Sequence, residues 1–218
     1  MNMRAYFSEF LGTTILLSTI IGSGIMGETL ADGNTAIALL GNTIATGAIL
    51  FVLITVFGPI SGAHFNPAVS IAMLISKKMT KIDAVIYIIL QIIGAVLGVL
   101  IAHLMFELQI FQISLKLRQG PSQGFSEIVA TFGLIIVIFG GLKVRPDAVP
   151  ALVGFYITSA YWFTASTSFA NPAVTLARSL SNTFAGINPS NIGMFIFCQF
   201  VGMLIAIIVV KYIFSSKQ

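Results

Sequence analysis

The segment NPAVSIAMLIS, residues 66–76, returns as NPAVTLARSLS at residues 171–181. Six of the eleven positions are identical, and the two copies start 105 residues apart. Asn is a favourable N-cap, and Pro suits the first helical position because it lacks the N–H that would have no partner there. We therefore expect a helix to begin at each of two tripeptides: Asn66, Pro67, Ala68 and Asn171, Pro172, Ala173.

The composition places these helices in a membrane. Of 218 residues, 57% are hydrophobic and 8% are charged, and the mean hydropathy is +1.00, whereas a soluble domain carries about 25% charged residues. So few charges cannot cover a soluble globule, which excludes a soluble enzyme, and the apolar content excludes disorder. The sequence offers no nucleophile–base pair, metal cluster, phosphate loop or nucleic-acid patch. We expect a protein that is not an enzyme, with no cofactor, no metal and no nucleic-acid partner.

Long apolar segments alternate with short charged loops. A spanning helix needs about 20 mostly apolar residues. Six segments have this length: 4–27, 34–56, 82–106, 124–142, 148–167 and 190–213. The stretches 66–76 and 171–181 are too short to cross a bilayer.

The loop charges predict the orientation of these spans. If the spans alternate, one side carries Arg4, Lys77, Lys78, Lys81, Lys143, Arg145, Lys211 and Lys217. The other side carries Glu28, Asp32, Glu107, Lys116 and Arg118. The positive-inside rule predicts that both termini are cytoplasmic.

The single domain, 1–218, reads as two repeats, about 1–106 and 118–218. Besides the repeated tripeptide, Ser8-Glu9 in the first half matches Ser126-Glu127 in the second. Each half holds three spans, so the second copy must be inverted relative to the first. Inverted repeats with short hydrophobic segments point to a site near the midplane. The small, polar segments 58–65 and 164–170 are expected to be non-helical and to line a water-filled path.

These motifs resemble the aquaporin (major intrinsic protein) family over essentially the whole chain. SGAHFNPAV at 61–69 is similar to the family signature, and EFLGT at 9–13 to its first-span motif. The resemblance implies an all-α membrane protein with six transmembrane helices and two re-entrant half-helices in an inverted 3+3 repeat. It also implies a homotetramer in the lipid bilayer, with a pore in each protomer.

The resemblance also implies roles for individual residues. Asn66 and Asn171 would donate side-chain N–H groups to the passing solute. Acceptors would come from the carbonyls of Gly62, Ala63, His64, Thr167, Ser168 and Phe169. Two interpretations of Glu9 and Glu127 stay open: a proton relay, or carboxylates that hold the re-entrant loops.

The chain departs from the family after the second tripeptide, where most aquaporins have Arg and this chain has Val174. Arg178 lies one helical turn further, and we interpret it as neutralising a carboxylate or reaching a loop. Family offsets predict a selectivity filter made of Thr46, Ser159, Ser168 and Val174, of which Ser159 is the least secure. A filter of small, mildly polar side chains should be wide.

We therefore expect a passive channel for water and small uncharged solutes: glycerol-like polyols, urea and neutral metalloid hydroxides such as arsenous acid. A compact prokaryotic protein of the inner membrane fits the short loops. A water-selective channel, an ion-coupled secondary transporter and a structural protein of the same fold remain the alternatives. The single cysteine, Cys198, excludes an intrachain disulfide.

Overall fold

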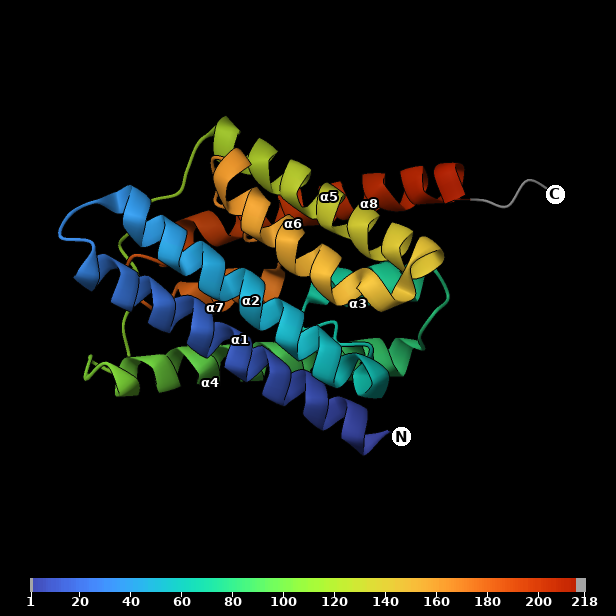
Figure 1. Ribbon diagram of the computed structural model, residues 1–218, viewed down its shortest axis with the longest axis horizontal. Helices are drawn as coiled ribbons and strands as arrows, with labels where there is room; N and C mark the ends of the chain where they lie inside the picture. Colours follow the sequence, from blue (N-terminus) through green and yellow to red (C-terminus); the bar gives the residue numbers. More distant parts are fainter. Residues whose placement is uncertain (1, 215–218) are drawn as a thin grey trace.

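A computed structural model describes residues 2–214, which form helices and loops without a strand. The longer helices are α1 (Met3–Leu30), α2 (Thr35–Ser61), α4 (Lys81–Met105), α5 (Pro121–Val144), α6 (Val149–Phe163) and α8 (Ile192–Phe214). They run alternately in opposite directions, so that the start of α1 and the end of α8 lie at the same end of the bundle (Figure 1). We call this the terminal end, and the opposite one the distal end.

Two short helices, α3 (Pro67–Ile75) and α7 (Pro172–Arg178), begin at the expected tripeptides. They lie between the long helices and enter from opposite ends, with their first residues toward the middle (Figure 1). Asn66 and Asn171 are their N-caps, and Pro occupies the first turn of each. The order of two long helices, one short helix and one long helix thus occurs twice along the chain.

The fifth expected span is shorter than predicted. Within residues 2–214, five helices are long and apolar enough to cross a membrane, and α6 is not among them. The expected segment 148–167 is helical over only 15 residues, preceded by the 3-10 turn η1 (Pro146–Ala148). The helix ends at Thr164, whose backbone is extended (φ −111°, ψ 138°). The small polar residues after it form a loop rather than a further turn of helix.

The second span is longer than predicted. We expected a non-helical segment from Gly58, but α2 continues through Pro59 to Ser61. Proline removes a single hydrogen bond, which membrane helices tolerate. The helix ends at Gly62, which takes the left-handed conformation (φ 84°), and whose N–H donates to the Gly58 carbonyl at 3.0 Å.

Small residues allow the long helices to pack closely. A Cβ on Gly94 or Gly98 of α4 would overlap backbone atoms of α1, and one on Gly202 of α8 would overlap the Ile128 carbonyl of α5. Close backbone approach at small residues is the usual way in which membrane helices associate. The pairs α1–α4 and α5–α8 hold the short helices between them.

Candidate functional site

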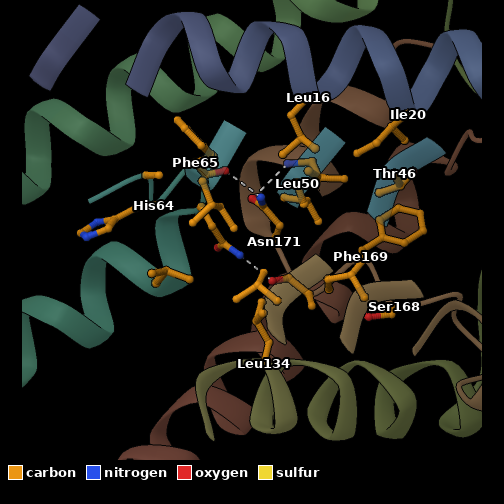
Figure 2. Close-up of a pocket in the computed structure, with 18 of the residues that line it drawn as sticks. Leu16, Ile20, Thr46, Leu50, His64, Phe65, Leu134, Ser168, Phe169 and Asn171 are labelled. Atoms are coloured by element: carbon orange, nitrogen blue, oxygen red, sulfur yellow. Dashed lines mark hydrogen bonds between the residues drawn. The ribbon is translucent and has the colours of Figure 1, made fainter. Parts of the chain in front are cut away.

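The two repeated asparagines meet at the centre of the bundle. Each Oδ1 accepts the backbone N–H two residues further on, at 2.9 Å for Asn66 and 3.0 Å for Asn171. Each amide also crosses to the opposite loop: Asn66 Nδ2 donates to the Ala170 carbonyl, and Asn171 Nδ2 to the Phe65 carbonyl, both at 2.8 Å (Figure 2). One N–H of each amide is thereby fixed, and the other makes no hydrogen bond to the described residues.

The loops before the two short helices have matching irregular backbones. The same three positions relative to Asn have positive φ in both, between 47° and 84°: Gly62, Ala63 and Phe65 in one loop, Thr167, Ser168 and Ala170 in the other. Positive φ is uncommon for residues other than glycine, and such strain clusters at functional sites. The repeat therefore extends to the backbone path of the loops.

Glu9 holds the first loop. Its Oε1 accepts the Ser61 hydroxyl (2.7 Å) and the His64 N–H (2.9 Å). Its Oε2 accepts the Phe65 N–H (2.7 Å) and the Gln91 amide (2.8 Å). Four donors on a fully buried carboxylate offset the loss of its hydration.

Glu127 holds the second loop in the same way. It accepts the N–H groups of Phe169 and Ala170, both at 2.9 Å, and the Gln199 amide at 2.7 Å. Of the two interpretations of these carboxylates, the geometry fits the one in which they position the loops.

Sequence reasoning missed the two glutamines. Gln91 Nε2 also donates to Ser70 Oγ (3.0 Å), and Gln199 Nε2 to Thr175 Oγ1 (2.9 Å). Each glutamine thus ties its carboxylate to the first turn of a short helix. The signal was available, because Ser70 and Thr175 occupy the same place in the repeat and each half carries a glutamine in its last long helix.

Three spaces follow one another through the protein. The central cavity, about 60 Å³ in volume, is lined by apolar side chains that include Leu16, Leu50 and Leu134, together with residues of both loops and both asparagines; Figure 2 shows Leu16 and Leu50 on one side of Asn171 and Leu134 on the other. The terminal pocket, at the terminal end, includes Gly62, Lys77 and Tyr87. The distal pocket includes Lys116, Arg118, Trp162, Thr167 and Phe184. His64 lines both the terminal pocket and the central cavity, and Arg178 lines both the central cavity and the distal pocket.

The expected acceptor residues are spread along this path. Ala63, His64, Ser168 and Phe169 line the central cavity, Gly62 lines the terminal pocket, and Thr167 lines the distal pocket. The two loops therefore contribute residues to all three spaces.

Three of the four expected filter residues line the central cavity: Thr46, Ser168 and Val174. The Ser168 hydroxyl has no hydrogen-bond partner among the described residues. Thr46 Oγ1 accepts the Tyr161 hydroxyl at 3.4 Å. These groups give the cavity wall both hydroxyl and apolar surface.

The assignment of Ser159 was wrong. Its side chain is exposed, and its hydroxyl donates to the Tyr156 carbonyl at 2.8 Å. The face of α6 that lines the central cavity carries Val153, Ile157 and Tyr161, at intervals of four residues. Ser159 is two residues from Ile157, about 200° around the helix. A family offset across the irregular loop after α6 does not determine which face of the helix a residue occupies.

Arg178 is buried and reaches a loop. Its Nε donates to the Ala185 carbonyl, and its Cζ lies 3.5 Å from the centroid of the Phe169 ring. It forms no ion pair in the described chain, and Glu127 is its carboxylate neighbour by longer-range electrostatics. Its Nη1 has no hydrogen-bond partner within residues 2–214.

Arg118 was not expected in the site. The loop between α4 and α5 carries it into the distal pocket, where Nε donates to the Gly186 carbonyl (2.9 Å) and Nη1 to the Ser166 carbonyl (3.3 Å). Its Cζ lies 4.9 Å from the centroid of the Phe169 ring. The structure thus brings two guanidinium groups to one aromatic ring at the distal opening of the central cavity.

The chain resembles known membrane proteins over most of its length. The family model "Major intrinsic protein" matches residues 1–166. Aquaglyceroporin AqpS of Rhizobium meliloti is 50% identical over 99% of this chain and 92% of its own length. An aquaglyceroporin of Toxoplasma gondii is 30% identical over 83% of this chain and 66% of its own length. The X-ray structure of the aquaglyceroporin from Plasmodium falciparum has the same fold, with a TM-score of 0.76, coverage of 99% and 98%, and 21% identity. The chain belongs to the major intrinsic protein family.

Proposed function

We propose that the protein is a passive membrane channel for water and small uncharged solutes, namely glycerol-like polyols, urea and neutral metalloid hydroxides. The observation that carries this proposal is the series of three spaces, joined at His64 and Arg178, with the crossed Asn66 and Asn171 amides at its centre. Pore width and lining polarity decide what passes. A cavity lined by apolar side chains together with hydroxyl and amide groups suits small molecules that carry both CH and OH groups.

The carboxylates support passive conduction rather than ion coupling. A coupled transporter needs a group that gains and loses its proton or ion during the cycle. Glu9 and Glu127 are fully buried, neither lines the central cavity, and each has at least three donors. They act as fixed supports for the loops.

The experiment is stopped-flow light scattering on proteoliposomes, with a glycerol gradient compared with a sucrose gradient. We expect fast reswelling in glycerol. Val174→Arg, which adds a long cation to the wall of the central cavity, should abolish it. Ser159→Ala, on the exposed face of α6, is the matched control and should conduct normally. Water flow with glycerol excluded would contradict the wide pore, and the absence of both flows would contradict a channel.

Saturable uptake that disappears with the proton gradient would instead favour coupled transport. The same proteoliposomes with and without an imposed pH gradient give this comparison. We expect glycerol flux to rise linearly with its concentration difference and to be unaffected by the pH gradient.

The family supports a homotetramer of independent pores, and the charge distribution supports cytoplasmic termini. Arg4, Lys77, Lys78, Lys81, Lys143, Arg145 and Lys211 lie at the terminal end, whereas Lys217 lies outside the described residues. In the Cys198→Ser background, an impermeant maleimide added to intact cells should label Gln109→Cys at the distal end and spare Lys143→Cys. The opposite pattern would reverse the orientation. The membrane concerned would be a prokaryotic inner membrane.

A further inference from the structure

We propose that the distal pocket binds a small oxyanion, a carboxylate in the first instance, between Arg118 and Arg178, and that this anion obstructs the pore while it is bound. The binding site is independent of what the pore conducts, and only the obstruction rests on the proposed function.

The first argument is the lack of a counter-charge within the distal pocket itself. Lys116, Arg118 and Arg178 all line the distal pocket, and none of its lining residues in the described chain is acidic. Two carboxylates lie near these cations without lining the pocket: Glu28, beside Lys116, accepts the Phe184 N–H at 3.2 Å, and Glu127, an electrostatic neighbour of both arginines, already has three donors. The cations are held by backbone carbonyls and aromatic rings: Lys116 Nζ donates to the Phe184 carbonyl (2.6 Å) and lies 4.5 Å from the centroid of that ring. Three cations so close together favour an anion between them.

The second argument is an unused donor. Arg178 is 1% exposed, and its Nη1 has no hydrogen-bond partner within residues 2–214. The Tyr161 hydroxyl, which donates to Thr46, is also a hydrogen-bonding neighbour of this guanidinium, and Nη1 is still left without an acceptor. A buried charged donor without an acceptor is costly. Because Arg178 lines both the distal pocket and the central cavity, an acceptor for this N–H would sit where the two spaces join.

The third argument is the geometry of the two arginines. Both guanidinium carbons lie near the Phe169 ring, at 3.5 Å from its centroid for Arg178 and 4.9 Å for Arg118. Arg118 uses Nε and Nη1 for contacts with the loop that follows α6 and with Gly186, and Nη2 makes no hydrogen bond to the described residues. Guanidinium groups bind carboxylates through paired, planar hydrogen bonds. An oxyanion held by both would occupy the opening that any solute must pass.

The chain provides its own probe. Its single tryptophan, Trp162, lines the distal pocket and is 49% exposed. Selective excitation of this residue in the detergent-solubilised protein therefore reports on the pocket directly. Sodium glycolate is the ligand, and sodium chloride at equal ionic strength is the control for screening.

We expect glycolate to change Trp162 emission saturably, and chloride to have no such effect. Arg118→Gln should weaken the apparent affinity at least about tenfold, since it removes a charged hydrogen-bond donor. Lys143→Gln removes an exposed cation at the terminal end and should leave the titration unchanged. No saturable change in the natural protein, an equal response to chloride, or an unchanged titration in Arg118→Gln would overturn the site.

The obstruction is tested separately in proteoliposomes. Glycolate in the external medium should slow glycerol reswelling in the natural protein and not in Arg118→Gln. Unchanged glycerol flux at a glycolate concentration that saturates Trp162 would overturn the obstruction. A protein that conducts no glycerol at all would contradict the proposed function, and the fluorescence titration would still decide the binding site.

Discussion

Val174 and Arg178 lie one helical turn apart on α7, and both line the central cavity, but only Arg178 also reaches the distal pocket. Where most aquaporins have arginine after the second tripeptide, this chain therefore has an apolar wall, with the positive charge displaced toward the mouth. The displaced guanidinium rests on Phe169 and hydrogen-bonds the Ala185 carbonyl. In those relatives a single arginine both narrows the pore and carries the charge. In this chain Val174 lies at the narrowing position and Arg178 carries the charge.

This separation predicts that bulk alone at residue 174 restricts large solutes. Val174→Phe adds volume without charge to the wall of the central cavity, so glycerol permeability should fall about tenfold while water permeability falls much less. Stopped-flow measurements with glycerol and sucrose gradients on the same vesicles give the ratio. Val174→Ala is the control and should leave glycerol flux at or above its natural level. An equal loss of both permeabilities in Val174→Phe would indicate that the cavity had collapsed rather than narrowed.

The face of α6 that lines the pore can be tested by thiol modification. In the Cys198→Ser background, Ile157→Cys places a thiol on the wall of the central cavity, whereas Ser159→Cys places one on the exposed face. A small methanethiosulfonate reagent should reduce glycerol flux in the first variant and leave the second unaffected. Inhibition through residue 159 instead would restore the filter predicted from the family offset.

That offset shows where prediction from sequence ended. The tripeptides specify two capped helices through local chemistry, so α3 and α7 began where expected. That Glu9 and Glu127 hold the re-entrant loops was one of two interpretations that the family resemblance left open. Counting back from Asn171 to α6 failed, because it depends on the length of an irregular loop, which local propensities do not fix.

The position of the Arg118 side chain in the distal pocket could not be predicted from the sequence, for a different reason. Its partners are backbone carbonyls 48 and 68 residues further along the chain, at Ser166 and Gly186. Carbonyls carry no sequence signal, so nothing in the residue types marks them as acceptors. The same holds for the Arg178 contact with the Ala185 carbonyl. The group of cations that lines the distal pocket became apparent only from the structure.

The loop-holding role of Glu9 predicts a large loss of stability on substitution. Glu9→Gln replaces one accepting oxygen by an NH₂ group that faces donors, so we expect the free energy of unfolding to fall by about 3 kcal/mol. Thermal unfolding of the purified protein in detergent measures the change. Glu107→Gln, on an exposed residue of the α4–α5 loop, should have almost no effect. A similar stability for both variants would contradict the role, and a loss of glycerol flux in Glu9→Gln without a loss of stability would favour direct participation in transport.

The lowered pKa of Lys116 predicts how anion binding in the distal pocket depends on pH. Partial burial, and then the charges of Arg118 and Arg178, lower the pKa of the Lys116 ammonium to about 8, with Glu28 acting weakly in the opposite direction. The lysine is therefore charged below pH 8 and becomes neutral as the pH rises through that value. The arginines keep their charge over this range, so glycolate affinity measured through Trp162 should fall between about pH 7 and 9 without disappearing. Lys116→Arg should abolish this decline, and Lys116→Gln should give the weaker affinity at every pH. A decline that persists in Lys116→Arg would assign the titration to another group.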